Sequence, residues 1–259
     1  MGEFDDIAVS RPADGVTLIV IARPEARNAL RTRTLAEIAA VLTAAADDAA
    51  ARAVVITGGV KHFAAGADLK EMAPLDAIGV LTHERPRHWR AIQSFPKPLV
   101  AAVCGYALGA GCELALACDL VVAGSNAQFG QPEINLGMIP GAGGAARLAR
   151  TCGKALAMQM VLTGAPIDAR AALAAGITVE VDEPESAIAR AIEIASLIAS
   201  KPPLAVRAAK EAVLRAFEAP LSEAVAADRQ AFALLAASED RREGIAAFLE
   251  KRTPRFTGR

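Results

Sequence analysis

The segment 105–124 reads GYALGAGCELALACDLVVAG and changes its character twice. Its glycines form a turn that leads into an apolar, helix-forming stretch around Glu113, and the segment ends in a run of Leu and Val. The apolar run 99–103 directly before it has the composition of a buried strand. A strand, a glycine turn, a helix and a second strand in this order predict parallel strands that are joined by crossover helices.

Short runs rich in Val and Ile, bounded by Gly, Pro, Asn or charged residues, occur at 16–21, 53–56, 99–103 and 120–123. These runs are predicted to be strands. Between the first two, Thr34-Leu35-Ala36-Glu37 has the spacing of a capping box, and Ile38 and Leu42 follow on the face of Leu35. We therefore predict an amphipathic helix that starts at this box, and an α/β fold.

Beyond Gly143 the apolar residues recur with a helical period, and the only further strand expected is 179–181. Three helical faces are predicted, made of Ile188, Ile192 and Ala195, of Leu221, Val225, Phe232 and Leu235, and of Ile245, Phe248 and Leu249. The last helix should end before Pro254. Because a multi-helix tail often completes its burial on another subunit, we expect the chain to oligomerise.

The length of 259 residues suits one compact core with an appendage. The 28 Lys and Arg residues balance 29 Asp and Glu residues, so no uniform field attracts nucleic acid or an anionic membrane. Residues 1–6 lack the basic and apolar stretches of an export signal, and glycines interrupt the longest apolar stretch, 98–112. We expect a soluble, cytoplasmic protein with no nucleic-acid or membrane partner.

The four cysteines, at 104, 112, 118 and 152, form no C-x-x-C pair, and no histidine is near them in the sequence. We expect small buried thiols and no metal site. The G-x-S-x-G, H-E-x-x-H and G-x-x-x-x-G-K-[ST] motifs are absent, and PGAGG at 140–144 lacks the preceding strand of a dinucleotide-binding loop. Any catalysis would then use carboxylates and backbone amides.

The segment 63–72, FAAGADLKEM, is one candidate for such chemistry. Small residues lead into the start of a helix, where backbone N–H groups have no partner within the helix and lie at its positive end. This arrangement stabilises a negatively charged oxygen. An ordinary turn of small residues before a helix would give the same pattern, so the segment alone does not establish a site.

Two glutamates are the other candidates. Glu113 lies in the first turn of an apolar helix, where a carboxylate is costly unless it is hydrogen-bonded or used, and where burial would raise its pKa. Glu133 follows a proline in the apolar stretch 129–134. A solvated helix-start residue and a surface-loop residue are the plain alternatives. The strand 120–123 separates the two glutamates, so only the fold can bring them together.

Together these segments resemble the crotonase (enoyl-CoA hydratase/isomerase) family. The resemblance covers the whole chain and rests on AAGADLKEM at 64–72, the segment 105–124, FGQPEINLGMIPGAGG at 129–144 and EDRREGIAAFLEKRTPRF at 239–256. The family implies an α/β crotonase-like (ClpP/crotonase) spiral of repeated β-β-α turns. Residues 1–200 would form the spiral core with the CoA and active sites, and residues 201–259 a helical region that makes a homotrimer or homohexamer.

The resemblance also implies roles for individual residues. The N–H groups of Ala67 and Ala110 would form an oxyanion hole, Glu113 would hold and deprotonate a water molecule, and Glu133 would protonate Cα. Gly141 would offer its N–H to the water. The implied reaction is addition of water across the 2,3 double bond of a 2-enoyl-CoA to give a 3-hydroxyacyl-CoA. No permanently bound cofactor is implied, since coenzyme A is part of the acyl-CoA substrate.

The CoA contacts implied by the resemblance are Ala26, Arg27, Ala65, Ala67, Asp68 and Leu69, together with Phe248 and Lys251, which would reach the CoA of a neighbouring subunit. Glu25 stands where many members have Lys, which leaves Arg27 as the charged contact at that edge. Ala145 and Ala146 replace a frequent Thr-Gln pair, and no effect is predicted for this change.

Two other functions remain open. An enoyl-CoA isomerase of the same fold usually keeps only one suitable acid, so the presence of both glutamates favours hydration. A non-catalytic acyl-CoA-binding or RNA-binding relative is disfavoured by the intact glutamates and the near-neutral charge.

The segment RPRHWRAIQSFPKPL at 85–99 extends the resemblance to members of phenylacetate breakdown that act on 2,3-dehydroadipyl-CoA. Arg85, Arg87 or Arg90 would then meet the distal carboxylate of such a substrate. Three solvated arginines on a helix are the alternative.

Overall fold

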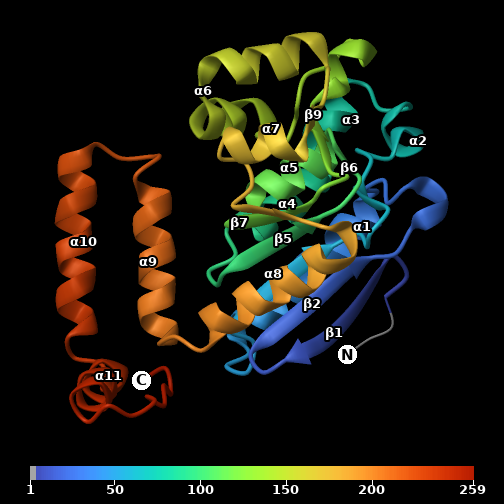
Figure 1. The fold of residues 1–259 in the computed structure, drawn as a ribbon. Helices are drawn as coiled ribbons and strands as arrows, with labels where there is room; N and C mark the ends of the chain where they lie inside the picture. Colours follow the sequence, from blue (N-terminus) through green and yellow to red (C-terminus); the bar gives the residue numbers. More distant parts are fainter. Residues whose placement is uncertain (1–3) are drawn as a thin grey trace.

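The computed structural model describes residues 4–259 and shows a body built on two sheets with a helical tail beside it (Figure 1). The larger sheet has the order β1 (Ile7–Ala13), β2 (Val16–Ile21), β3 (Ala53–Thr57), β5 (Leu99–Val103), β7 (Leu120–Gly124) and β10 (Glu180–Asp182). The smaller sheet has the order β4 (His62–Ala64), β6 (Tyr106–Leu108), β8 (Gln128–Gly130) and β9 (Ile167–Asp168). All pairs are parallel except β1 with β2 and β8 with β9.

The chain winds through the two sheets as a spiral. The strands β3, β5 and β7 of the larger sheet lead directly into β4, β6 and β8 of the smaller one, and a helical segment then returns the chain to the larger sheet. These segments are α2 (Leu69–Met72), α3 (Ala77–Thr82) and α4 (Arg85–Gln93) after β4, and α5 (Ala110–Ala117) after β6. After β8, the 3-10 helix η2 (Pro132–Leu136) and α6 (Gly144–Thr163) lead first to β9 of the smaller sheet, and α7 (Ala169–Ala174) then returns the chain to β10 of the larger sheet. Residues between β4 and α2, between β6 and α5, and around η2 therefore lie at one end of the molecule.

The central strands are buried on both faces, which explains their uninterrupted apolar sequences. One face packs against the alanines of α8 (Pro184–Ala199), whose small side chains allow the helix to approach closely. The other face packs against α1 (Thr32–Asp47), which buries Leu35, Ile38 and Leu42. The four strands predicted at 16–21, 53–56, 99–103 and 120–123 are confirmed, as is the helix between the first two.

The capping box predicted for α1 is wrong. The helix begins at Thr32, whose N–H and hydroxyl donate to the Glu71 carboxylate at 2.7 and 2.8 Å. Thr34 lies inside the helix and donates to buried Asp6 at 2.6 Å, and Glu37 accepts main-chain N–H groups of the segment before β1. Carboxylates that are distant in sequence have replaced the local pairing, because the fold places them against the first turn.

Short strands account for most of the other differences. The strand expected at 179–181 forms as β10, shifted by one residue. The strand β9, which also lies after Gly143, was not predicted. It has two residues and pairs with β8. β4, β6 and β8 have three residues each, too few to produce a period in the sequence.

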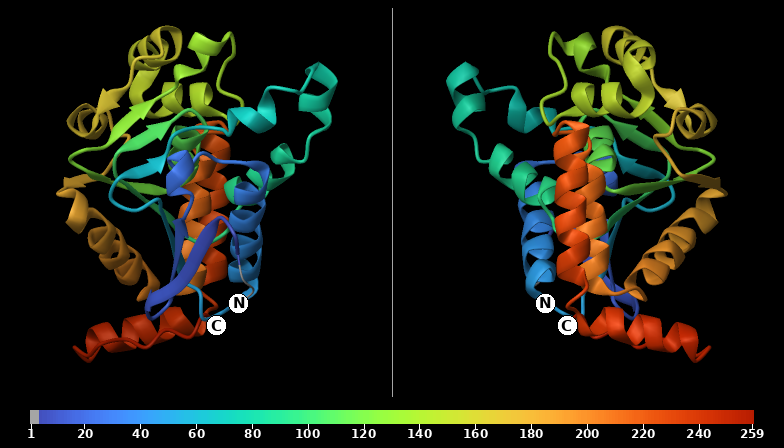
Figure 2. Two further views of the ribbon diagram at one scale, coloured as in Figure 1. Left: turned by 90° about the vertical axis from the view of Figure 1, so that its right-hand side faces the viewer. Right: turned by 90° about the vertical axis from the view of Figure 1, so that its left-hand side faces the viewer.

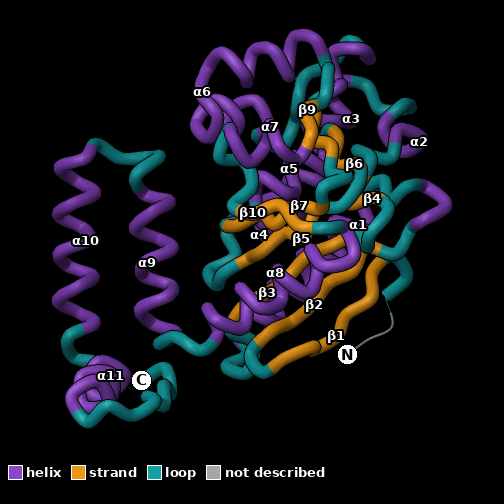
Figure 3. The backbone as a smooth tube through the Cα atoms, viewed as in Figure 1, coloured by secondary structure: helices purple, strands orange, loops and turns teal. Residues whose placement is uncertain are grey.

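The helical tail consists of α9 (Pro203–Arg215), α10 (Leu221–Leu235) and α11 (Glu239–Leu249), and its last helix ends before Pro254 as predicted. α9 and α10 run side by side next to the body, and α11 lies across their lower end (Figures 2 and 3). Lys210 of α9 contacts Asp119 of the body at 2.7 Å. Large apolar side chains of the tail are exposed, including Leu221 and Phe232 at 79% each.

Candidate active site

Glu113 is held inside the molecule by two main-chain amides. It lies in the first turn of α5 and is 3% exposed. Its Oε1 accepts the N–H of Ala142 at 2.6 Å and the N–H of Gly144 at 2.9 Å. Within residues 4–259 no donor bonds to Oε2. One oxygen of the carboxylate is therefore fixed by the protein, and the other can contact a small molecule.

The pKa of Glu113 is raised, chiefly because burial disfavours the charged form. The two amides oppose this effect, and so do the charges of Arg147 and Arg85. The carboxyl group thus sits in an environment that makes it a better base than an exposed glutamate and still supports its ionised state.

Glu133 lies at the start of η2 and is half-buried. The side-chain amide of fully buried Gln131 lies beside it, and with its nitrogen toward the carboxylate it donates to both Glu133 oxygens at 3.1 and 3.2 Å. Burial raises the pKa of Glu133, its own main-chain N–H lowers it, and the negative charge of Glu113 raises it again. The neighbouring charge therefore favours a protonated Glu133 when Glu113 is ionised.

The fold brings the two glutamates into one site, which the sequence could only suggest. A Cβ built on Gly109, the residue before α5, would lie 2.8 Å from Glu133 Oε1. A Cβ built on Gly144 would overlap with the Gln131 amide and lie 3.0 Å from Glu113 Cγ. Glycine is required at both positions because the backbone passes directly against the carboxyl groups and the amide beside them.

The two predicted oxyanion donors lie next to each other at the edge of this site. Among residues 4–259 neither the Ala67 N–H nor the Ala110 N–H donates to any protein acceptor. Gly66 and Gly109 precede them, and a Cβ built on Gly109 would lie 3.8 Å from the Gly66 Cα. Two unpaired amides beside a pair of carboxyl groups are suited to bind an oxygen that gains negative charge.

The segment 26–30 is joined to the first donor segment by main-chain hydrogen bonds. Leu30 N–H donates to the Gly66 carbonyl at 2.8 Å, and Asp68 N–H donates to the Leu30 carbonyl at 3.0 Å. Arg27 has an exposed side chain and a left-handed backbone conformation with φ of 49°. The predicted CoA residues on this edge, Ala26, Arg27, Ala65, Asp68 and Leu69, thus belong to one continuous strip.

Asp68 has a structural role in this strip. Its carboxylate accepts the N–H of Lys70 at 3.2 Å and forms an ion pair with buried Arg23 at 3.1 Å. Its carboxylate and its main-chain N–H, which donates to the Leu30 carbonyl, are therefore both bonded within the protein. Leu69 beside it is exposed.

The three arginines of α4 differ from one another. Arg85 is only 7% exposed, donates to the Leu30 carbonyl at 3.1 Å and lies 3.6 Å from Glu71. The alternative of three solvated arginines is therefore wrong for Arg85, because this guanidinium joins α4 to the strip. Arg87 and Arg90 are exposed.

Phe248 and Lys251 lie far from the glutamates of their own chain. α11 is at the opposite end of the molecule from α2 and α3 in every view (Figures 1 and 2). Phe248 is 83% exposed, and Lys251 follows α11 with φ of 55°.

Several residues of the site were not found from the sequence. Gln131, Ala142 and Gly144 contact the glutamates directly, and Gln93 of α4 donates to the Ala142 carbonyl at 2.9 Å. The signal that could have found them is the glycine-rich loop 140–144, in which the resemblance had implied a role for Gly141 alone. Gly141, in the same loop, is exposed, with open space beside its Cα.

The sequence matches the family model described as Enoyl-CoA hydratase/isomerase over residues 11–259. The chain belongs to the enoyl-CoA hydratase/isomerase family. It is 52% identical to the 2,3-dehydroadipyl-CoA hydratase of Escherichia coli K12, an alignment that covers 99% of this chain and all of that one. It is 46% identical to the mitochondrial enoyl-CoA hydratase of Pongo abelii, over 93% of this chain and 83% of that one.

Solved structures confirm the predicted crotonase-type fold. An enoyl-CoA hydratase from Geobacillus kaustophilus superimposes with a TM-score of 0.95 at 45% identity and covers both chains completely. One from Bacillus anthracis gives a TM-score of 0.93 at 37% identity, over 98% of this chain and all of that one. The β-β-helix spiral with its helical tail is therefore the family fold.

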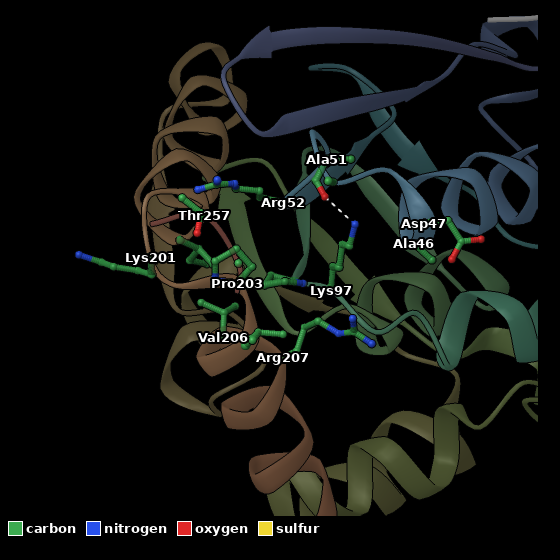
Figure 4. Close-up of a pocket in the computed structure, with 15 residues that line it drawn as sticks. Ala46, Asp47, Ala51, Arg52, Lys97, Lys201, Pro203, Val206, Arg207 and Thr257 are labelled. Atoms are coloured by element: carbon green, nitrogen blue, oxygen red, sulfur yellow. Dashed lines mark hydrogen bonds between the residues drawn. The ribbon is translucent and has the colours of Figure 1, made fainter. Parts of the chain in front are cut away.

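The cavity of about 240 Å³ in Figure 4 lies between the body and the helical tail and shares no residue with this site. Its cationic lining includes Arg52 and Lys97. Lys97 donates to three main-chain carbonyls at the end of α1, at 2.6 to 2.8 Å, and Arg52 donates to the carbonyls of Ala199 and Phe256. Because these donors are already bonded, we interpret the cavity as the joint between the two parts.

Within 4–259 there is no cluster of three or more His, Cys, Asp or Glu side chains suited to a metal ion. All four cysteines are free, and burial raises the pKa of each thiol, that of Cys104 to about 11. No helix in this part of the chain has the length and apolar character of a membrane span.

Proposed function

We propose that this protein is an enoyl-CoA hydratase in which Glu113 is the base and Glu133 the acid. The observation that carries the proposal is the pairing of two carboxyl groups in contrasting environments beside two unpaired amides. Glu113 accepts two N–H bonds, which support its ionised form, whereas Glu133 lies near that negative charge. The names of the relatives, both hydratases, support the proposed reaction.

In the proposed reaction a water molecule binds to the free oxygen of Glu113, with the Gly141 N–H as a second contact. Glu113 takes a proton from the water while the water oxygen bonds to Cβ of the enoyl group, and Glu133 gives its own proton to Cα. One water is consumed and one 3-hydroxyacyl-CoA is formed. Proton exchange between the two carboxyl groups and solvent restores the starting state.

The N–H groups of Ala67 and Ala110 would bind the thioester oxygen during this step. Negative charge grows on that oxygen as the water adds at Cβ, and donors that are already in place stabilise it without reorganisation. Loss of one such donor typically raises the barrier by about 3 to 4 kcal/mol. The CoA moiety would lie along the strip of Ala26, Arg27, Ala65, Asp68 and Leu69.

The hydratase proposal is tested by incubating the protein with crotonyl-CoA and following the loss of enone absorbance. Hydration at an enzymatic rate is the expected result. Migration of the double bond in a 3-enoyl-CoA without hydration would indicate the isomerase instead. Binding of acyl-CoA with no turnover of either compound would indicate a non-catalytic relative.

For the substrate we propose 2,3-dehydroadipyl-CoA, since the relative with 52% identity carries that name. Arg87 and Arg90, both exposed on α4, are the candidates for its distal carboxylate. The variants Arg87→Ala and Arg90→Ala should lower kcat/KM for 2,3-dehydroadipyl-CoA more than for crotonyl-CoA. Equal losses on both substrates would exclude this role.

We further propose that residues 201–259 form the oligomerisation region and that the protein is a homotrimer or homohexamer. The exposed apolar residues of the tail support this, among them Leu221, Phe232 and Phe248. Phe248 and Lys251 would then contact the CoA of a neighbouring subunit. Light scattering should give the mass of three or six chains, and Phe232→Asp should reduce it, whereas a monomeric wild type would refute the proposal.

A further inference from the structure

The position of Glu113 depends on the loop 140–144. This loop connects η2 to α6 and provides both amides that bind the Glu113 Oε1, those of Ala142 and Gly144. Glycines flank Ala142, and Gly143 has φ of 102°. Such a sequence has few side chains that could fix its conformation by packing. The amides therefore need another contact to keep them directed at the carboxylate.

Gln93 supplies such a contact from another part of the chain. It is the last residue of α4, and its Nε2 donates to the Ala142 carbonyl at 2.9 Å. The helix itself is fixed, because Trp89 and Ile92 are buried in the core and α4 packs along α1. The Gln93 side chain is half-buried. The fixed helix α4 thus holds the Ala142 carbonyl through Gln93. This carbonyl belongs to the peptide group that joins Ala142 to Gly143, between the N–H donors of Ala142 and Gly144.

We propose that Gln93 is a positioning residue for Glu113, which it orients through the main chain of Ala142. By fixing the Ala142 carbonyl, Gln93 sets the direction of the peptide planes on either side and keeps both N–H groups on the same carboxylate oxygen. The inference rests on the proposed hydratase function and extends it to Gln93, a residue with no role in the reaction proposed above.

Other charges also face Glu113 and bear on the test. Arg85 of α4 and Arg147 of α6 are the positive charges that favour its ionised form, and Glu133 of η2 is the other carboxyl group of the site. None of them is removed by changing Gln93. A shift in the titration of Glu113 in a Gln93 variant would therefore arise from its two amide bonds.

The test is Gln93→Leu, which keeps the helix and nearly the volume but removes the donor. Without it the two amides should lose their alignment, and the pKa of Glu113 should rise. We expect the acid limb of the kcat/KM profile for crotonyl-CoA to move to higher pH. The kcat should fall about fivefold to tenfold, the effect of one ordinary hydrogen bond, with KM nearly unchanged. Gln93→Glu should show a larger loss above its own pKa, because a carboxylate repels the Ala142 carbonyl.

Thr178→Val is the matched control. This variant also removes a buried side-chain bond to main-chain carbonyls, those of Val121 and Glu180, which lie outside the site. It should lower Tm and leave the pH profile in place. If Gln93→Leu changes only Tm in the same way, Gln93 is merely structural and the proposal is wrong.

A second measurement does not depend on activity. In protein labelled with ¹³C at the glutamate carboxyl carbons, the Glu113 resonance can be assigned from its absence in Glu113→Gln. Gln93→Leu should raise the titration midpoint of this resonance relative to wild type. An unchanged midpoint would overturn the inference about Gln93, whether or not crotonyl-CoA proves to be a substrate. Absence of hydration by the wild type would refute only the proposed function.

Discussion

The surroundings of Glu113 and those of Glu133 differ although the side chains are identical. Glu113 projects from a regular helix, is almost fully buried and accepts two main-chain N–H groups. Glu133 projects from a short 3-10 helix, is partly open and has a side-chain amide beside it. Burial raises the pKa of both, but the amides and two arginines lower that of Glu113, whereas the charge of Glu113 raises that of Glu133. These different surroundings support the proposed roles of Glu113 as the base and Glu133 as the acid.

The largest expected effect comes from removing either carboxyl group. Glu113→Gln and Glu133→Gln should each lower kcat for crotonyl-CoA by at least about 100-fold, because each variant loses one of the two proton transfers. The dissociation constant of the CoA ester should hardly change. Glu185→Gln, in the first turn of α8, is the control and should behave as wild type. Near-normal turnover of either variant would remove that residue from its role.

A smaller loss is expected when the backbone is pushed away from the pair. Gly144→Ala should lower kcat about tenfold, the scale of a small displacement of a catalytic group, because its Cβ would displace the Gln131 amide and press on Glu113. Gly176→Ala is the control. It has φ of 74° with open space around it, so alanine should cost about 1 kcal/mol of stability and no activity. Steady-state kinetics and thermal unfolding of both variants distinguish the two effects.

The assignment of base and acid predicts the shape of the pH profile. Glu113 must be ionised, so kcat/KM should rise with pH through its raised pKa, and Glu133 must be protonated, so kcat/KM should fall through its own raised pKa. Both limbs should lie above the ordinary glutamate value of 4.5. The residual activity of Glu133→Gln should lack the alkaline limb. A residual profile that lacks the acid limb instead would reverse the two roles.

The smallest effect concerns stability. A carboxyl group with a raised pKa in the folded state stabilises the fold below its unfolded pKa, and this contribution is lost as the pH rises through the folded pKa. At neutral pH the folded state has lost this contribution from Glu113. The variant Glu113→Gln has no ionisable group at this position, and its side-chain amide oxygen can still accept the two N–H groups. The Tm of the variant should exceed that of wild type at pH 8, and the difference should shrink toward pH 4. A constant difference across this range would contradict the raised pKa.

The central strands and the helices could be predicted from the sequence because each has a period or a composition of its own. Residues of β3 and β5 are apolar throughout since both faces of the sheet are covered. The short strands β4, β6, β8 and β9 carry no such signal, since two or three residues cannot display a period. The start of α1 was misplaced because the N–H and the hydroxyl of Thr32 donate to Glu71, which the local sequence does not contain.

The candidate site was only partly visible in the sequence. Glu113 and Glu133 could be singled out as carboxylates in apolar surroundings, and the resemblance to the family named the oxyanion donors. The resemblance could not show that Gln131, Ala142 and Gly144 surround the pair, because main-chain amides have no side-chain signature. The burial of Arg85 was missed for a related reason, since its partners Leu30 and Glu71 come from separate segments.

The bridge between Leu30 and Ala67 has a consequence for how substrate binding and catalysis are related. The same hydrogen-bonded backbone carries the edge assigned to coenzyme A and the amide assigned to the thioester carbonyl oxygen. Binding energy gained at the nucleotide can therefore hold the reacting end in place. A thioester that ends at pantetheine should consequently be hydrated with a reduced kcat, even at concentrations that saturate the enzyme.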